Sequence, residues 1–201
     1  RLLKNIAGLW LLQECRRIWK EQGNEFSWSE LVGKAEAASP LVSLIHPDDA
    51  RFVAPKNMPA AIQGYCDETG QMVPGSEGAI VRCIFESLAL RYRQVLNWLR
   101  ELTGASIQTI HIVGGGTQNQ LLCQMAADAC NCRVVAGPVE ATAIGNILTQ
   151  AMGCGELTGL EQIREVVARS FVLETYNPDD PDFDLEADEE LFERYRELLK
   201  R

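Results

Sequence analysis

The chain has 201 residues, of which 46% are hydrophobic and 23% charged, and its formal net charge is −9. This composition is that of a globular protein and argues against disorder over the whole length. The acidic balance argues against a nucleic-acid-binding protein or one that binds an anionic membrane surface, and no apolar run reaches the roughly 20 residues of a membrane helix.

The first hundred residues carry the periodicity of helices and no strand pattern. A capping-box pattern, Ser27 with Glu30, marks the start of one helix. Four turn signals in 40–58 predict an ordered loop, within which 41–45 is expected to be extended. The helices predicted from the apolar spacing lie over 5–22, 28–38, 59–68 and 77–102.

Strand patterns begin after this point and alternate with helices. Two short β-branched runs, 107–113 and 133–136, each end in glycine and are each followed by a helical pattern, an order typical of a parallel α/β sheet. Thr158 and Glu161 form a second capping-box pattern. The helices predicted in this half lie over 118–130, 140–153, 159–169 and 186–200.

The predicted strands are too few for a buried parallel sheet, which usually has about four to six. Further strands are expected in the weak segments 41–45 and 171–175 or, preferentially, in sequence before residue 1. The chain also opens without Met and directly into a helical pattern, so we expect it to be part of a longer protein. An incomplete sheet has an open edge, and we expect the isolated chain to self-associate through it.

The negative charge is concentrated near one end of the sequence. Residues 174–193 contain ten acidic and no basic side chains, and the rest of the chain has a balance of +1. We therefore expect an acidic surface loop before the last helix. The remaining body is nearly neutral, and its charge does not oppose binding of an anionic ligand.

The cysteines and histidines predict neither a disulfide scaffold nor a metal site. The seven cysteines are an odd number without paired CxxC spacing, which is typical of free thiols in a reducing cytoplasm. Cys66 and Cys83 flank a turn-rich stretch and would close a loop if oxidised, but two separate thiols are favoured. His46 lies in a turn, and His111 is expected to be a core or edge histidine. No Ser-His-Asp or Cys-His arrangement is present, so no catalytic residue is assigned on this chain.

The segment IHIVGGGTQNQLL carries the most informative chemistry. A strand leads to Gly114, Gly115 and Gly116, and a helix is expected to start directly after them. Glycines let a ligand lie close to the backbone, and the N–H groups at a helix N-terminus favour an anion, so this arrangement is suited to binding phosphate. Gln118 and Asn119 are placed to hydrogen-bond a base or ribose. Neither the dinucleotide fingerprint nor the Walker A pattern is satisfied, so a tight turn without a ligand is the alternative.

Residues 110–152 resemble the C-terminal signature of the FGGY carbohydrate kinases. Three further stretches, 5–19, 45–71 and 82–96, narrow the resemblance within that family to the members that phosphorylate L-rhamnulose. The similarity covers the chain to about residue 175. Two other interpretations remain: an FGGY kinase for xylulose, fuculose or glycerol, and a non-catalytic actin-like nucleotide-binding module.

The resemblance implies part of a ribonuclease-H-like (actin-like ATPase) fold, with ATP and Mg²⁺ bound in a cleft between two such domains. It makes 1–175 the C-terminal nucleotide-binding domain without its first strands, and 176–201 an acidic loop and C-terminal helix. Asn5 matches a sugar-contacting position. The implied ATP contacts are Gln13, Gly114, Gly115, Gly116, Gln118 and Asn119.

Two parts of the family's active site have no counterpart in this sequence. These are the phosphate-binding DxGxxS segment and the aspartate that accepts the proton of the sugar hydroxyl. Phosphoryl transfer needs metal, phosphate contacts and a base together. We therefore expect this chain alone to be inactive.

Overall fold

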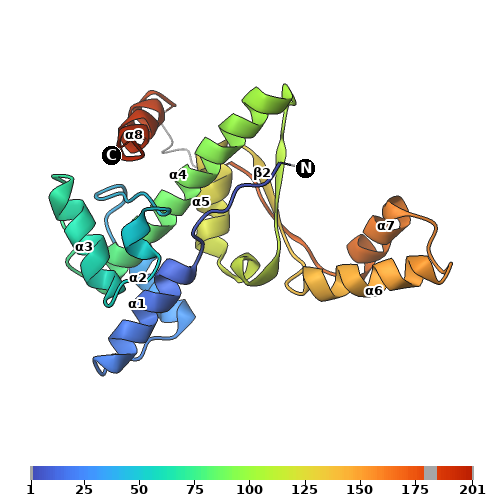
Figure 1. Cartoon of the computed structure of the whole chain (residues 1–201), viewed down its shortest axis with the longest axis horizontal. Coiled ribbons are helices and arrows are strands. Elements are labelled where there is room, and N and C mark those ends of the chain that lie inside the picture. The colour runs from blue at the N-terminus through green and yellow to red at the C-terminus, as the bar shows by residue number, and fades with distance from the viewer. Residues whose placement is uncertain (1, 179–184, 201) are drawn as a thin grey trace.

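The computed structural model describes the backbone of residues 2–178 and 185–200, and the side chains of 2–178 and 189–200. The chain is helix-rich, with a small three-stranded sheet (Figure 1). In chain order the elements are α1 (Trp10–Glu21), α2 (Trp28–Glu36), the 3₁₀ helix η1 (Ala50–Phe52), α3 (Met58–Glu68), α4 (Glu77–Thr103), β1 (Thr109–Ile112), the 3₁₀ helix η2 (Gly114–Gln118), α5 (Gln120–Cys130), β2 (Arg133–Ala136), α6 (Ala141–Gly153), α7 (Leu160–Ser170), β3 (Glu174–Tyr176) and α8 (Leu185–Leu198).

Helix α4 is the centre of the structure. Its 27 residues begin at a cap in which the Ser76 hydroxyl accepts from the Ala79 N–H, and they end at Gly104, which has a φ of +65°. Both are standard helix-terminating devices. Helices α1, α2 and α3 pack along one part of α4, and α5 packs along another.

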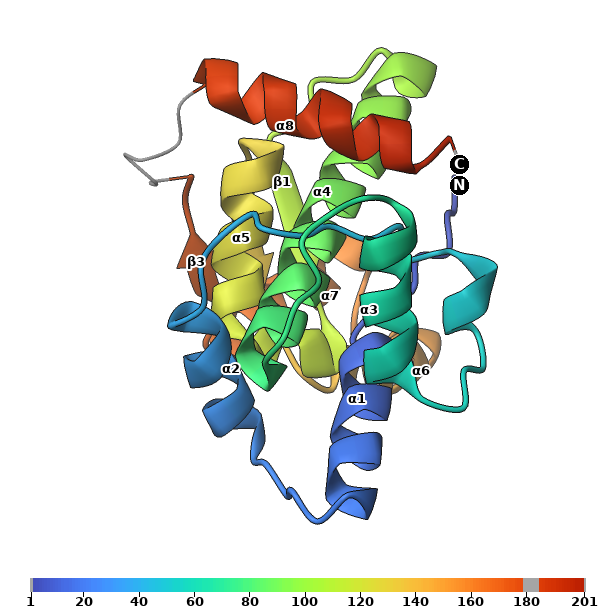
Figure 2. The ribbon, with the colours of Figure 1, turned by 90° about the vertical axis from the view of Figure 1, so that its left-hand side faces the viewer.

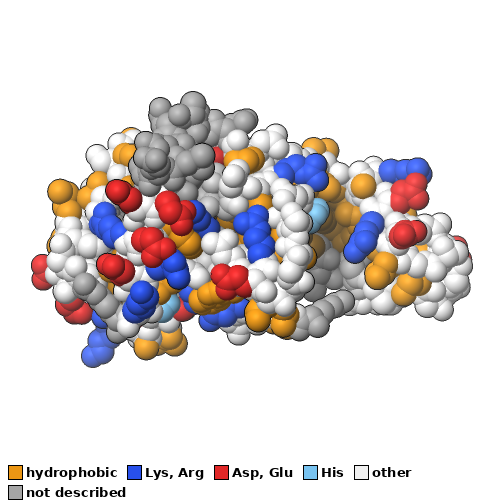
Figure 3. Space-filling view, turned by 90° about the horizontal axis from the view of Figure 1, so that it is seen from above, with side chains coloured by type: hydrophobic (Ala, Val, Ile, Leu, Met, Phe, Trp, Pro, Cys, Tyr) orange, Lys and Arg blue, Asp and Glu red, His pale blue; other side chains and the backbone are white. Residues whose placement is uncertain are grey.

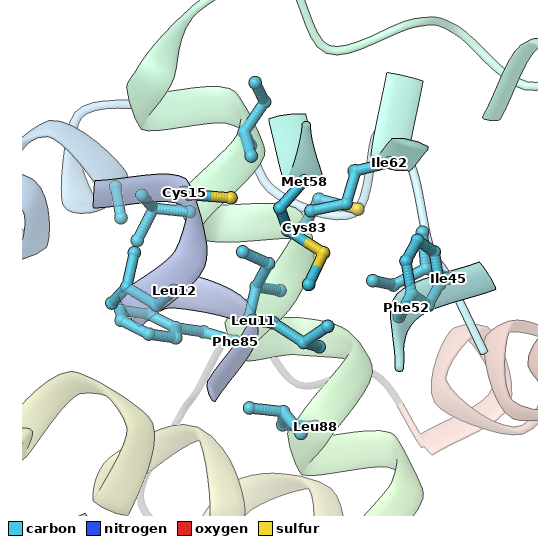
Figure 4. Packing of buried hydrophobic residues seen from close by; sticks show 14 of the residues in the cluster. Leu11, Leu12, Cys15, Ile45, Phe52, Met58, Ile62, Cys83, Phe85 and Leu88 are labelled. Carbon is cyan, nitrogen blue, oxygen red and sulfur yellow. The ribbon is translucent and has the colours of Figure 1, made fainter. Parts of the chain in front are cut away.

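The main core lies between α1, α3 and α4. Figure 4 shows side chains from these helices and from the loop around η1 converging on one another. Most of them are fully shielded from water, so their burial is the main source of stability in this half of the chain. The largest include Leu11, Phe52, Met58, Ile62, Phe85 and Leu88.

The sheet has the order β1-β2-β3. β1 and β2 are parallel, with Thr109 opposite Arg133, as the strand–helix–strand order predicted. β3 returns antiparallel to β2, with Val134 opposite Tyr176. β3 overlaps the weak segment 171–175, so that expectation is confirmed for one further strand. One edge of β1 has no partner strand among the described residues.

Helices α6 and α7 stand away from the rest of the molecule (Figure 1). Neither helix has a buried residue, and Ile147 of α6 is 65% exposed. Helix α8, in contrast, lies across α4 (Figure 2) and buries Phe192, Tyr195 and Leu198 against Leu44 and Leu90.

Two predictions about the first fifty residues are wrong. Helix α1 begins at Trp10 rather than at residue 5, because the segment before it is irregular although Ile6 still packs on the core. No strand forms at 41–45. The backbone N–H and C=O of Leu44 bond instead to the side-chain amide of Gln71, at 2.9 and 2.8 Å, and so have no need of a neighbouring strand.

The capping boxes have opposite outcomes. The box of Ser27 and Glu30 is present at the start of α2. The predicted box of Thr158 and Glu161 is wrong, because Gly159 is the N-cap of α7. The Thr158 N–H and hydroxyl both bond to the side-chain oxygen of Gln162 instead.

The six cysteines other than Cys154 are buried, and all seven are free thiols. The thiols of Cys66 and Cys83 are hydrogen-bonded to each other, which, together with burial, raises the pKa of Cys83. Cys66 and Cys83 thus lie in direct contact, without a disulfide between them in the structure. Of the predicted acidic loop, residues 179–184 lie outside the described residues.

On the face seen in Figure 3, acidic and basic side chains are interspersed and form no patch of one sign. Among the described residues, no helix is both long enough and apolar enough to cross a membrane.

Candidate functional site

A pocket of about 370 Å³ lies at the carboxyl ends of β1 and β2. In open α/β sheets this edge is where ligands bind, because the loops after parallel strands meet there. Two hydrogen bonds tie the loops together, from Gly114 N–H to the Pro138 carbonyl and from Gly137 N–H to the Ile112 carbonyl. The lining residues are Thr117, Gln118, Gln120, Ala136, Gly137, Pro138, Val139, Glu140, Ile144, Phe171, Val172 and Glu174.

The three glycines form the 3₁₀ helix η2, and α5 begins only at Gln120. The predicted α-helix directly after the glycines is therefore two residues too early. The cause is Asn119, whose non-helical backbone (φ −97°, ψ 87°) separates the two helices. Its side-chain oxygen accepts from the Leu122 N–H at 3.0 Å and caps α5.

The glycines have different reasons to lack a side chain. Gly114 has a φ of +81°, in the left-handed region that favours glycine. Gly115 is exposed, and its φ lies outside that region. A Cβ on Gly115 would meet no atom of the described chain within 4 Å. The backbone at Gly115 is therefore accessible, and the packing of the described chain does not require a glycine at this position.

The polar residues after the glycines are placed in different ways. Gln118 is exposed and lines the pocket, as a ligand contact would. Asn119 is only 8% exposed, and its oxygen is used by the helix cap. Thr117 also lines the pocket, and its hydroxyl donates to the Gly114 carbonyl at 2.8 Å, which stabilises the turn.

Sequence reasoning missed the far wall of the pocket. Phe171 and Val172 precede β3 and reach the pocket because β3 folds back against β2. Val172 is 94% exposed and Phe171 is 40% exposed, so apolar surface is available to a ligand there. The signal for this wall was the weak strand pattern at 171–175, which gave no indication of pairing direction.

Gln13 lies elsewhere on the chain. It is exposed on the first turns of α1 and lines a second pocket of about 290 Å³ with Arg16, Arg17, Lys20, Glu25 and Trp28. The basic side chains there already have partners: Arg17 pairs with Glu14 and Glu21, and Lys20 pairs with Glu25. The described chain therefore does not bring Gln13 into the pocket of the glycine turn.

Asn5 is exposed in the irregular segment before α1. Two of its neighbours contact one carboxylate: Ala7 N–H donates to Asp48 Oδ1 at 2.7 Å, and Lys4 Nζ lies 3.7 Å from Oδ2. Arg91 donates to the same Oδ2 from Nε and a terminal nitrogen, at 3.0 and 2.8 Å. Partial burial opposes ionisation of Asp48, but these partners outweigh it and hold its pKa below the usual value.

Neither histidine lies in the pocket. His111 is exposed on the edge strand β1, which confirms the edge alternative. His46 is half-buried beside Arg91, and burial, followed by that charge, lowers its pKa. The described residues contain no group of three His, Cys, Asp or Glu side chains placed to hold a metal ion.

The sequence is similar to one family of proteins over most of its length. The model of the FGGY family of carbohydrate kinases, C-terminal domain, matches residues 1–154. A rhamnulokinase of Bacteroides thetaiotaomicron is 53% identical over 180 residues, which are 90% of this chain and 36% of that protein. A rhamnulokinase of an Enterobacter species is 48% identical over 178 residues, 89% of this chain and 36% of that protein. The chain thus spans about a third of the length of these relatives.

Solved structures share the fold at low sequence identity. The structure of Plasmodium falciparum glycerol kinase with ADP superposes with a TM-score of 0.63 at 14% identity and covers 95% of this chain and 37% of that one. The structure of xylulose kinase from Rhodospirillum rubrum has a TM-score of 0.59 at 19% identity and covers 94% of this chain and 36% of that one. These similarities establish the fold alone.

Proposed function

The chain belongs to the FGGY family of carbohydrate kinases and is the C-terminal part of such a kinase, and on that premise we propose that the complete protein phosphorylates L-rhamnulose. The reaction converts L-rhamnulose and ATP to L-rhamnulose 1-phosphate and ADP. The choice of sugar rests on the identity of 53% over most of the chain to a protein named rhamnulokinase.

The pocket at the glycine turn is proposed as the ATP site of this chain. The observation that carries this assignment is Gly115, whose missing side chain leaves space that no other part of the described chain uses. Gly114 and Gly116 shape the turn, and Gln118 is exposed toward the pocket. Asn119 supports the site by capping α5.

The remaining contacts are proposed from the family resemblance. Gln13 contacts ATP from α1, and Asn5 contacts the sugar. Both side chains are exposed, as such roles require. Because Gln13 lies outside the glycine-turn pocket, its role requires ATP to extend beyond the pocket described above.

Magnesium accompanies ATP in this proposal. Mg²⁺ is usually held by substrate phosphates with one or two carboxylates, and it needs no dedicated cluster of ligands. The described residues offer no such cluster. This chain therefore fits a metal that arrives with the nucleotide, and phosphate contacts come from backbone N–H groups of the turn rather than from lysine or arginine.

The organisation of the chain follows from the same proposal. Residues 1–175 form the nucleotide-binding domain without its first strands, and 176–201 form the acidic loop and last helix. We place the complete protein in the cytoplasm, where its substrates and free thiols would be expected. The isolated chain self-associates through the open edge of its sheet.

The direct test is ADP release by the complete protein, measured in a coupled assay with L-rhamnulose, xylulose, fuculose and glycerol. We expect the highest kcat/KM with L-rhamnulose. Residues 1–201 alone are expected to give no turnover above a buffer control, because the sugar-activating aspartate and the other half of the cleft are absent.

Two outcomes would overturn the proposal in different ways. A higher kcat/KM with another sugar would retain the kinase and change its substrate. ATP binding by the complete protein without turnover of any sugar would favour the non-catalytic nucleotide-binding module.

A further inference from the structure

We infer that Asp48 is a positioning residue for the sugar site. Its carboxylate fixes the segment 4–7 to helix α4 and thereby sets the position of Asn5. This inference rests on the proposed function, in which Asn5 contacts the sugar. It does not assign Asp48 any contact with the substrate itself.

The carboxylate is rigidly held from the side of the core. Arg91 projects from α4, is only 4% exposed, and donates two hydrogen bonds to Asp48 Oδ2. Its guanidinium also stacks over the ring of Trp98, 5.1 Å from the centroid. A planar guanidinium that lies over a ring on one face and donates two hydrogen bonds from its edge has little freedom, so the position of its carboxylate partner is well defined.

Both oxygens of the carboxylate contact the segment that carries Asn5: Oδ1 accepts from the Ala7 N–H, and Lys4 Nζ lies near Oδ2. This segment has no helix or strand hydrogen bonds, and among the described residues Asp48 is the one side chain that bonds to it. The contacts to Ala7 and Lys4 lie on either side of Asn5. Ile6 packs on the core between them and gives the segment an apolar anchor, but an apolar contact does not fix direction as a hydrogen bond does.

The neighbouring carboxylate, Asp49, does something different and is a matched control. Its oxygen accepts from the Arg51 N–H at 2.9 Å, which caps η1, and it pairs with the Arg51 guanidinium. It has no hydrogen bond to the segment 4–7. Replacing Asp49 therefore removes a charge and a cap from the same loop but leaves the segment in place.

The experiment compares Asp48→Ala, Asp48→Asn and Asp49→Ala in the complete protein, with the KM values for L-rhamnulose and for ATP measured separately. We expect Asp48→Ala to raise the sugar KM by about tenfold or more, since small misplacements of a contact residue have effects of up to about 100-fold. The ATP KM should change less than twofold. Asp48→Asn, which keeps an acceptor for the Ala7 N–H, should have an intermediate sugar KM, and Asp49→Ala should match the wild type.

A second measurement reports on the segment without any activity. Hydrogen exchange of the Ala7 amide in the complete protein should accelerate at least tenfold in Asp48→Ala and remain unchanged in Asp49→Ala. Equal increases in the two KM values, or a lower Tm with unchanged KM values, would overturn the positioning role. If Ala7 exchange accelerates but the wild type does not turn over L-rhamnulose, the anchoring stands and the proposed function fails.

Discussion

Two glycines that are equivalent in the isolated chain are expected to differ in their effect on ATP binding. Gly115 in the turn and Gly33 in α2 both lie outside the left-handed region, and a Cβ on either would meet nothing within 4 Å. Neither is needed for the packing of the described residues. Only Gly115 belongs to the turn that we propose as the nucleotide site. We therefore expect a side chain there to weaken ATP binding without destabilising the fold.

We therefore predict that Gly115→Ala raises the ATP KM of the complete protein about tenfold, which corresponds to about 1.4 kcal/mol. The Tm should stay close to that of the wild type, because the added methyl group has open space. Gly33→Ala makes the same chemical change on an exposed helix position and should leave the ATP KM unchanged. An unchanged ATP KM in Gly115→Ala would remove the turn from the nucleotide site.

At the scale of elements, α4 organises the molecule because helices α1, α2, α3, α5 and α8 all pack on it. Where α4 meets α2, Gly78 lies against the backbone of Lys34. A Cβ on Gly78 would lie 2.4 Å from the Lys34 carbonyl oxygen, a distance that real atoms do not adopt. Since the obstacle is helix backbone, the two helices would have to move apart.

Gly78→Ala is accordingly expected to destabilise the protein by about 1–3 kcal/mol, the usual range for overpacking. Thermal unfolding of the complete protein measures the effect. Gly64→Ala in α3 is the control, because a Cβ there meets nothing and alanine favours helix over glycine by about 1 kcal/mol. Equal Tm values for the two variants would show that α2 and α4 are not held at this separation.

The elements whose limits are set locally were predictable from the sequence. Helix α2 begins at the capping box of Ser27 and Glu30, and α4 begins at Ser76 and ends at Gly104. These caps act through contacts a few residues away, so the sequence alone indicates where the helices begin and end. The β2 limits were predicted without error for a similar reason, because Gly137 follows the strand at once.

The elements that depend on distant contacts were not predictable. Gln71 bonds to the backbone of Leu44 in place of a strand partner, and Asp48 accepts from the Ala7 N–H in the irregular segment before α1. In the candidate site, the glycine turn was predictable from the sequence. The wall at Phe171 was not, because it depends on the antiparallel pairing of β3 with β2. No local pattern in the sequence carries this information.

At the scale of the whole molecule, the two halves of the chain differ in how much apolar surface they bury. Helices α1–α4 enclose a continuous core, whereas α6 and α7 bury no residue and one edge of β1 is unpaired among the described residues. Along a parallel strand, the backbone groups of every second residue point to the same neighbouring strand. The carbonyls of Gln108 and Ile112 accept from the N–H groups of Arg133 and Gly137, so these two residues of the β1 segment face β2. His111 lies between them in this alternation, and its N–H therefore points to the open edge.

The self-association of the isolated chain can be tested at this edge. Light scattering of residues 1–201 should give a mass above that of the monomer, and His111→Pro should restore the monomer because proline removes the N–H that pairs with a second copy. The bonds between β1 and β2 do not use that N–H. His111→Ala keeps the N–H and should still associate; a monomeric wild type at high concentration would refute the prediction.

The position of α8 has a consequence for how the chain is made. Arg194 of this helix bonds to Gln71 across 123 positions, and Tyr195 is buried with Leu44 and Leu90. At synthesis rates of roughly 5–20 residues per second, the interval between Gln71 and Arg194 takes about 6–25 seconds. For that time Leu44 and Leu90 lack the cover that α8 gives them in the folded chain. Transiently exposed apolar surface makes a folding chain prone to aggregate, so the arrival of α8 ends a period in which the chain is vulnerable.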